Sequence, residues 1–224
     1  MTAQYCFLDL PTVFGALGAY AFLNNYVSLP LHTTECEYAQ SLSLRRFREY
    51  QAGRSLARQL LVSKRPDSVE NDWCVTASNG RRPCVLFRGE LLVGMSVSIT
   101  HTKELVAVVV SDQCQVGIDA EPMTRSIKET IWPQVFSPAE QNYLGDLEPD
   151  EVQMRARELW CLKESMSKAA GMGMAVSFSD VGFSRYDGIW RIEGLPVGEA
   201  FKGRWLAPYL ARQAEYLFAV SGYS

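Results

Sequence analysis

Positive charge is in short supply along this chain of 224 residues. Its 22 lysine and arginine residues are outnumbered by 25 aspartate and glutamate residues, which gives a formal net charge of −3. Proteins that bind nucleic acid through its phosphates need a strong basic field, so we expect no nucleic-acid partner. This charge balance still allows a local group of arginines and lysines around one phosphorylated ligand.

Paired metal-binding motifs are lacking as well. The chain has only two histidines and six cysteines, and no two cysteines are spaced as CxxC. A structural zinc site is therefore not expected. We expect reduced and mostly buried thiols, as in a cytoplasmic protein, at Cys6, Cys36, Cys74, Cys84, Cys114 and Cys161.

Long hydrophobic runs are also missing. No run approaches the ~20 apolar residues that a membrane-spanning helix needs. The apolar N-terminal region around residues 14–23 has no lysine or arginine before it, and Asp9 and Pro11 interrupt it. These features do not fit a secretory signal. We therefore expect a soluble cytoplasmic protein without a membrane partner.

The composition that is present, 47% hydrophobic and 21% charged, is that of an ordinary globular protein. The length fits one large domain or two small ones. A chain of this length buries roughly 70% of the surface that its unfolded form exposes. A hydrophobic core can therefore form without disulfides or a structural metal.

Hydrophobic periodicity predicts two long helices, at Leu44–Ser63 and at Glu151–Ala170, the second ended by Gly171 and Gly173. The β-branched run at 105–111 predicts a central strand that is buried on both faces. Residues 1–43 have an irregular pattern that predicts short strands or helical turns. The other predicted strands are 73–77, 84–87, 95–99, 114–118, 176–179, 183–186, 189–192, 202–206 and 215–221.

The two halves of the chain repeat one order of elements, a helix followed by several antiparallel strands. Val106–Ser111 in the first half is similar in pattern to Tyr216–Ser221 in the other half, and we interpret them as equivalent strands. We therefore predict an α+β fold built as a pseudo-twofold pair of similar subdomains. The predicted division gives residues 1–118 and 119–224, with a site between them.

Two carboxylates stand at the end of a predicted strand, in the segment Val116-Gly117-Ile118-Asp119-Ala120-Glu121-Pro122. If the strand has already broken there, which Pro122 favours, Asp119 and Glu121 can point into one cleft. Their oxygens would then suit a partly hydrated Mg²⁺ that binds a diphosphate. The alternative is a solvated loop with two surface acids.

Charged residues also cluster on the second predicted helix. At about 100° per residue, Trp160, Lys163, Glu164 and Lys168 share a face that spans about 140°. A carboxylate between two ammonium groups can complete a metal site or remove a proton beside an anionic ligand. The alternative is an ordinary surface pair, because Glu followed by Lys at i+4 is favoured on exposed helices.

The first half offers groups that suit phosphate. The segment Ser98–Thr102 supplies hydroxyls and an imidazole between two strands, and Arg46 and Arg54 lie eight residues apart on one helix. Three further residues, Arg81-Arg82-Pro83, follow the turn at Asn79-Gly80. The alternatives are a structural histidine and solvated surface arginines.

In their order and spacing, these motifs resemble those of the 4′-phosphopantetheinyl transferases. The likeness is nearest to the monomeric, two-halved type that activates non-ribosomal peptide and polyketide synthases. The basic helix around Arg46 and Arg54 resembles that of the siderophore-associated branch, and Ser98–Thr102 resembles its Ser-x-Ser-His-Ser segment. Gly80–Pro83 resembles its Gly-Lys-Pro element, but one extra basic residue leaves open whether Arg81 or Arg82 takes the role of the lysine.

The resemblance implies an enzyme that transfers the phosphopantetheine arm of coenzyme A to a serine of a carrier protein and releases adenosine 3′,5′-bisphosphate. It implies Mg²⁺, or Mn²⁺, held by Asp119, Glu121 and Glu164. Glu164 would take the serine proton, directly or through a metal-bound water, and Lys168 would stabilise the leaving phosphate. The residues implied to contact coenzyme A are Arg46, Arg54, Arg82, Pro83, Thr100, His101, Lys163 and Lys168.

The implied partner is an acyl or peptidyl carrier protein domain, and the implied state is a monomer. Ile127, Ile131 and Val135 repeat at i+4, which predicts an amphipathic helix that packs inward or offers a docking surface. Two other functions stay open. One is a coenzyme A or carrier-binding protein without activity, which would be marked by a broken acid triad. The other is a Mg²⁺-dependent hydrolase of small diphosphates, which would need no carrier.

Overall fold

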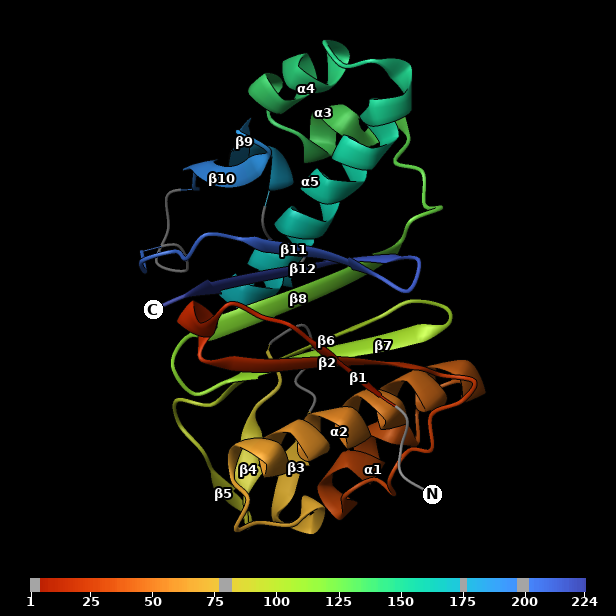
Figure 1. Ribbon diagram of the computed structural model, residues 1–224. Coiled ribbons are helices and arrows are strands. Elements are labelled where there is room, and N and C mark those ends of the chain that lie inside the picture. The colour runs from red at the N-terminus through yellow and green to blue at the C-terminus, as the bar shows by residue number, and fades with distance from the viewer. Residues whose placement is uncertain (1–4, 77–81, 174–176, 197–201) are drawn as a thin grey trace.

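Two antiparallel sheets lie face to face in the middle of the molecule (Figure 1). The computed structural model describes residues 5–76, 82–173, 177–196 and 202–224. The first sheet has the order β1 (Cys6–Leu8), β2 (Ala16–Phe22), β7 (Leu105–Ser111) and β6 (Ser96–His101). The second has the order β11 (Tyr209–Gln213), β12 (Tyr216–Tyr223) and β8 (Gln115–Pro122). The predicted α+β class is confirmed.

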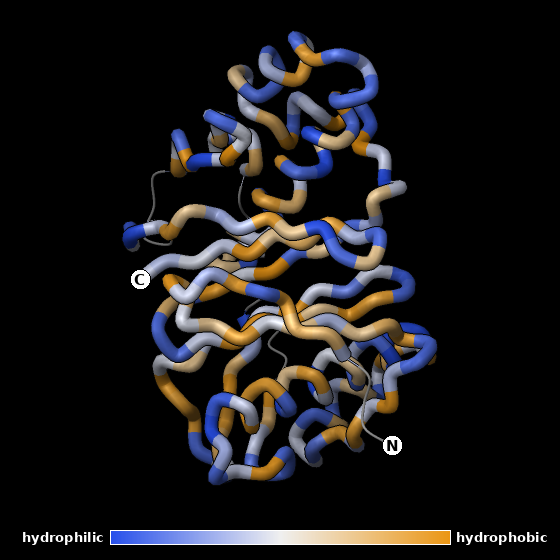
Figure 2. Tube along the Cα trace, in the orientation of Figure 1, coloured by the Kyte–Doolittle hydropathy of each residue, from blue (hydrophilic) through white to orange (hydrophobic). Residues whose placement is uncertain are grey.

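Alternation along β7 builds two layers of the core. Its valines at 106, 108 and 110 pack toward α2 (Leu44–Lys64), whereas Leu105, Ala107 and Val109 pack toward the second sheet. All residues of β7 are buried, which confirms the predicted central strand. Figure 2 shows the apolar strands gathered at the waist of the molecule, as expected when both faces of a sheet are covered.

Two long helices cover the outer faces of the two sheets. α2 packs on β7 and β2, and α5 (Pro149–Ala170) packs on β8 and β12. Proline at the first turn of α5 suits a position that needs no amide hydrogen bond, and Gly171 ends the helix in the left-handed region at φ 72°. Both helices that the hydrophobic periodicity predicts are therefore present.

The approach between β8 and α5 is close enough to require glycine at one position. A Cβ atom at Gly117 would overlap the backbone of Ser165 and Ala169 on α5. Gly117 therefore lets the strand that carries Asp119 and Glu121 lie directly against the helix that carries Glu164 and Lys168.

The two sheets also meet edge to edge, along β6 and β8. Both strands are outermost in their sheets, and hydroxyl groups of β6 link them in place of a backbone ladder. The hydroxyl of Ser96 accepts from the amide of Val116 at 3.0 Å, and that of Ser98 accepts from the amide of Ile118 at 3.1 Å. The hydroxyls therefore satisfy edge amides of β8 that would otherwise be buried without partners.

Smaller elements surround these layers. A third antiparallel sheet has the order β3 (Trp73–Val75), β4 (Val85–Phe87) and β5 (Glu90–Leu91), and a hairpin joins β9 (Gly182–Tyr186) and β10 (Ile189–Gly194). The short helices are α1 (Thr33–Ala39), α3 (Trp132–Val135) and α4 (Pro138–Gly145). No helix in the described ranges is both long enough and apolar enough to cross a membrane.

Several predicted elements need correction. The strand predicted to end at Ile118 continues to Pro122, so no break precedes Asp119. The Asn79-Gly80 turn, Arg81 and the first residue of the strand predicted at 176–179 lie outside the described residues. The remaining residues of that predicted strand include part of a 3-10 turn at Phe178–Asp180. The segment 202–206 forms only an isolated bridge from Trp205 to Tyr223.

The amphipathic helix expected around Ile127, Ile131 and Val135 is not continuous. A 3-10 turn at Glu129–Ile131 precedes α3, and Ile127, Val135 and Phe136 belong to the core beneath α5. These side chains therefore pack inward. The expectation of mostly buried thiols is also wrong, because Cys6, Cys36 and Cys84 are exposed.

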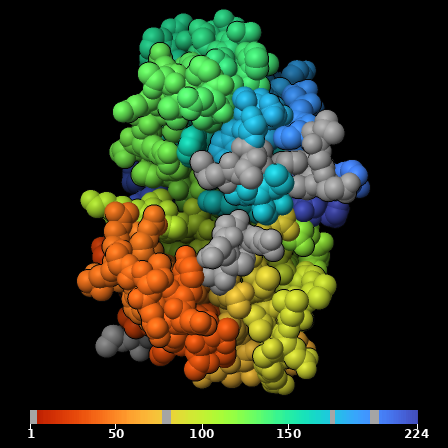
Figure 3. Space-filling view, turned by 180° about the vertical axis from the view of Figure 1, so that it is seen from behind, coloured from red at the N-terminus to blue at the C-terminus, as the bar shows by residue number. Residues whose placement is uncertain are grey.

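The first and second halves of the chain occupy different parts of the molecule. In Figure 3 the N-terminal residues, red to yellow, form the lower part, and the residues from green to blue form the upper part. The predicted boundary between residues 118 and 119 falls inside β8, which pairs with β12 along its length. The division of the chain into functional halves stays a prediction.

Candidate functional site

Asp119 is the centre of a polar cluster where β6, β8 and α5 meet. Its side chain is almost fully buried, with 4% of the residue exposed. The Oδ1 atom accepts from the Thr100 hydroxyl at 3.1 Å and from the Lys168 ammonium group at 2.7 Å. The buried Oδ2 atom has no hydrogen-bond partner among the described residues. One carboxylate oxygen is therefore anchored, and the other is buried without a hydrogen-bond partner.

Glu121 lies on the same face of β8, because residues two apart on a strand point the same way. Its Oε1 atom accepts from the indole of Trp160 at 3.0 Å and from the guanidinium of Arg125. Burial, followed by the charge of Asp119, raises the pKa of Glu121 to about 7, although Arg125 and Trp160 oppose the shift. The same alternation places Val116, Ile118 and Ala120 in the apolar layer between the sheets.

Glu164 and Lys168 stand one turn apart on α5 and face Asp119. The carboxylate of Glu164 makes no hydrogen bond or ion pair within the described part of the chain. Burial raises the pKa of Glu164; the charge of Asp119 adds to the shift, and Lys168 opposes it. Burial alone would lower the pKa of Lys168, but the carboxylates of Asp119 and Glu164 outweigh it and raise that pKa.

We call Asp119, Glu121 and Glu164 the acid cluster. Burial raises the pKa of both glutamates, and repulsion by the charge of Asp119 adds to each shift. A divalent cation that binds carboxylate oxygens would relieve this repulsion, and it would give the buried Asp119 Oδ2 the partner that it lacks among the described residues. No three His, Cys, Asp or Glu side chains in the described ranges are already gathered closely enough to hold a metal ion.

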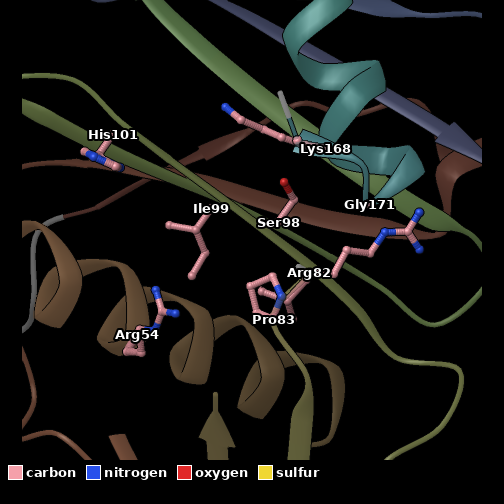
Figure 4. A pocket seen from close by; sticks show the side chains of 10 residues that line it. Arg54, Arg82, Pro83, Ser98, Ile99, His101, Lys168 and Gly171 are labelled. Carbon is pink, nitrogen blue, oxygen red and sulfur yellow. The ribbon is translucent and has the colours of Figure 1, made fainter. Parts of the chain in front are cut away.

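A cavity of about 260 Å³ is lined by Lys168, whose ammonium group donates to Asp119 (Figure 4). Figure 4 shows Lys168 and Ser98 on one side of it and Arg54 and Pro83 on the other. A second cavity of about 450 Å³ shares Arg54, Ile99 and His101 with the first. Predicted site residues that line one or both cavities are Arg46, Arg54, Arg82, Pro83, His101 and Lys168.

Arg46 and His101 form a charged group at the outer cavity. The Glu49 carboxylate accepts from Arg46 at 2.9 Å and lies 3.4 Å from the Nε2 atom of His101, which also contacts Arg46. Burial lowers the pKa of His101; Arg46 and Lys168 add to this effect, and Glu49 opposes it. We therefore expect a neutral imidazole at neutral pH, able to donate or accept one hydrogen bond.

Arg54 is buried in the wall that the two cavities share. Its Nε atom donates to the carbonyl of Val75 at 3.3 Å, and its guanidinium lies over the ring of Tyr50, 4.0 Å from the centroid. Burial lowers the pKa of Arg54, although an arginine stays protonated at neutral pH. The Val75 bond uses one of five N–H donors, so the other end of the guanidinium fork can face a ligand.

Arg82 spans the two halves of the chain. It precedes β4, but its guanidinium donates to the hydroxyl of Tyr223 on β12 at 3.0 Å and to the side chain of Gln115 on β8. Figure 4 shows it beside Gly171 at the end of α5. Its neighbour Arg81 lies outside the described residues. The choice between Arg81 and Arg82 as the ligand-contacting residue therefore stays open.

Lys163 is a predicted site residue that the structure places away from both cavities. Its side chain is 0% exposed, and its ammonium group pairs with Glu140 at 2.8 Å. It also donates to the carbonyls of Phe178, at 2.7 Å, and Val181. The helix wheel put Lys163 at the edge of the shared face, and its side chain turns toward α4 and β9. The expectation that Lys163 contacts coenzyme A is therefore corrected.

Residues 115–219 match the family model of the 4′-phosphopantetheinyl transferase superfamily. The matched segment contains the acid cluster and Lys168. It does not contain Arg46, Arg54, Arg82 or His101, which come from the first half of the chain. No curated protein matches the chain.

The chain is also similar to solved structures of holo-[acyl-carrier-protein] synthases. For the Thermotoga maritima protein the identity is 19% and the TM-score 0.42, over 50% of this chain and 64% of that chain. For the Neisseria meningitidis protein the identity is 18% and the TM-score 0.39, over 49% of this chain and 97% of that chain. For the Helicobacter pylori protein in complex with coenzyme A the identity is 23% and the TM-score 0.31, over 49% of this chain and 99% of that chain.

Two residues at the site were not predicted from the sequence. Arg125 pairs with Glu121, and Tyr223 anchors Arg82. Arg125 follows Glu121 by four residues, a spacing that signals a pair only within a helix, whereas here a turn follows the strand. Tyr223 is 141 residues away from Arg82, and no local pattern predicts such a contact.

Proposed function

We propose that this protein transfers the 4′-phosphopantetheine arm of coenzyme A to a serine of an apo carrier protein and releases adenosine 3′,5′-bisphosphate. The superfamily match over residues 115–219 carries the proposal, because it contains the acid cluster and Lys168. The geometry supports it, since Lys168, which donates to Asp119, lines a cavity together with Arg54, Arg82 and His101 from the other half. Phosphoryl transfer needs such positioning and a concentrated positive field.

In this proposal the first half, residues 1–118, binds the nucleotide end of coenzyme A. Arg54 and Arg46 supply guanidinium groups, and His101 supplies a hydrogen bond, for the 3′-phosphate and the neighbouring anionic groups. The buried Thr100 hydroxyl donates to Asp119, so Thr100 would position that carboxylate. Arg82 and Pro83 also line the cavity. The second half, residues 119–224, supplies the reacting groups, so the substrate lies across the seam between the halves.

The reaction would use Glu164 as the base. Its carboxylate has no hydrogen-bond partner among the described residues, so it could receive the proton directly or through a bound water. The serine oxygen forms a bond to the β-phosphorus, the bond from that phosphorus to the bridging oxygen breaks, and the serine proton passes to Glu164. Lys168, held at 2.7 Å by Asp119, would stabilise the charge that develops on the leaving 5′-phosphate.

The acid cluster fits Mg²⁺, or Mn²⁺, as the proposed metal. Asp119 Oδ2 and Glu164 have no partner among the described residues, and both are oxygen donors of the kind that these ions prefer. Glu121 would be the third ligand. Because the three carboxylates are not gathered closely, we propose that the diphosphate completes the ligand set. The ion, when bound, would neutralise charge on the diphosphate.

We infer a monomeric, cytoplasmic enzyme of the two-halved type that acts on acyl or peptidyl carrier domains of non-ribosomal peptide, polyketide or siderophore synthesis. The motifs around Arg46–Arg54 and Ser98–Thr102 support this branch. The net charge of −3 supports the absence of a nucleic-acid partner.

Intact-mass measurement of candidate apo carrier domains tests the function. Incubation with the protein, coenzyme A and Mg²⁺ should add the mass of one phosphopantetheinyl group to the carrier. A carrier with alanine in place of the acceptor serine should stay unmodified. Cleavage of coenzyme A without any carrier would instead indicate a diphosphate hydrolase. Binding of coenzyme A without either product would indicate a binding protein.

Recognition of the 3′-phosphate should depend on Arg54. Arg54→Met keeps much of the side-chain volume but removes the donors, and a charge-assisted hydrogen bond contributes ~1.5–3 kcal/mol, or roughly 10- to 150-fold in affinity. Calorimetry should show this loss for coenzyme A and a much smaller one for dephospho-coenzyme A, which lacks the 3′-phosphate. Equal losses for both ligands would place Arg54 away from that phosphate.

A further inference from the structure

Arg125 provides a positive charge to the acid cluster from within the chain. Its guanidinium donates to Oε1 of Glu121 and lies over the ring of Trp160, 4.6 Å from the centroid. The Trp160 indole donates to the same Oε1 atom at 3.0 Å. Guanidinium and indole therefore hold one carboxylate oxygen of a residue that the proposed function assigns to the metal.

Hydrogen bonds hold the backbone of Arg125 in place, whereas its side chain is partly exposed to solvent. The Arg125 carbonyl accepts from Nε and Nη2 of Arg157 at 2.8 and 2.6 Å, and Arg157 is buried. The Arg125 amide donates to the carbonyl of Pro122 at 2.9 Å. The Arg125 side chain, by contrast, is 37% exposed. It can therefore move into solvent without disturbing the turn that follows β8.

We propose that Arg125 is an exchangeable counter-cation: it occupies Glu121 while no divalent ion is bound, competes with that ion, and so sets the metal affinity of the site. This inference rests on the proposed metal role of the acid cluster. A carboxylate oxygen that accepts from a guanidinium is less available to a metal, and the positive charge of that guanidinium repels the ion. Displacement by the ion frees Arg125 without leaving a buried charge unpaired, because the side chain reaches solvent.

The experiment compares Mg²⁺ binding by three proteins, each saturated with coenzyme A, in calorimetric titrations with MgCl₂. Arg125→Gln removes the competing charge and keeps a polar side chain. Arg88→Gln is the matched control, because Arg88 also pairs with a carboxylate, Asp72 at 3.2 Å, and lies over a ring, Phe87 at 4.9 Å. We expect Arg125→Gln to bind Mg²⁺ at least ~10-fold more tightly than the wild type, and Arg88→Gln to match the wild type.

Melting and fluorescence measurements give an independent readout, which requires neither activity nor calorimetry. In EDTA, Arg125→Gln should melt at a lower temperature than the wild type, because its acid cluster has lost a counter-charge, and Mg²⁺ should raise its melting temperature more. Mg²⁺ should also change the tryptophan fluorescence of the wild type as Arg125 leaves the Trp160 ring. Trp160→Phe should abolish that change.

Equal or weaker Mg²⁺ binding by Arg125→Gln would overturn the proposal, and so would the absence of measurable binding by both proteins. Carrier modification is measured separately, so the two proposals fail in different ways. Tighter Mg²⁺ binding by Arg125→Gln with no transfer to any carrier would contradict the proposed function and support the exchange. Transfer by the wild type with unchanged Mg²⁺ affinity in Arg125→Gln would support the proposed function and contradict the exchange of Arg125 for the ion.

Discussion

Asp119→Asn should lower the rate of carrier modification by roughly 10²–10³-fold, the loss typical when one preorganised charge or donor is removed from an active site. The Asp119 carboxylate holds Lys168 at 2.7 Å and Thr100 at 3.1 Å through one oxygen, and its other oxygen is buried without a hydrogen-bond partner among the described residues. An amide in its place removes the charge that positions the lysine and offers a metal ion only a neutral oxygen. Intact-mass time courses at saturating coenzyme A and Mg²⁺ measure the rate.

The chain contains a matched control for this substitution. Asp112 pairs with Lys64 at 2.6 Å, at nearly the same distance as in the Asp119–Lys168 pair, but its side chain is 50% exposed. Asp112→Asn should leave the transfer rate unchanged. A near wild-type rate for Asp119→Asn would remove Asp119 from the mechanism. A loss of stability of about 3–5 kcal/mol would mean that the Asp119–Lys168 pair serves the fold instead.

Local patterns predicted the elements whose stability is local. The helix predicted at 44–63 is α2 at Leu44–Lys64, and the strand predicted at 105–111 is β7 with the same bounds. Such segments carry their whole periodic signal within the element. The short helix α1 had no such signal, because distant contacts hold it: the Glu35 carboxylate accepts from the amide of Val75, 40 residues later.

The candidate site divides in the same way. Turn spacing along α5 places Glu164 and Lys168 on one face, and this period can be read from sequence. The alternation that places Asp119 and Glu121 on one face of β8 was not predicted, because Pro122 favoured a break in the strand before Asp119. The helix wheel could not decide the direction of Lys163, which lies at the edge of the shared face. That direction depends on Glu140, which a different helix presents, so only the packing of α4 against α5 could reveal it.

Lys163→Met should destabilise the fold by about 3–5 kcal/mol, because it leaves a buried carboxylate without its counter-charge. Glu140 also accepts from the amides of Ser137 at 2.7 Å and Phe183 at 2.9 Å, so the pair ties the start of α4 to β9. Loss of the ammonium group also removes the donor to the carbonyls of Phe178 and Val181. Urea unfolding, followed by tryptophan fluorescence, measures the free energy of unfolding.

Two further variants separate this structural role from a role in the site. Lys64→Met removes the lysine of a pair whose aspartate is exposed, Asp112, and should cost only about 0–1 kcal/mol. In Lys163→Met combined with Glu140→Gln, part of the loss should be recovered, because the unpaired buried charge is gone and the two residues are in contact. Coenzyme A affinity, measured by calorimetry below the unfolding transition, should stay at the wild-type value in Lys163→Met. A variant as stable as the wild type but with weakened coenzyme A binding would return Lys163 to the binding site, since a buried structural lysine cannot give that result.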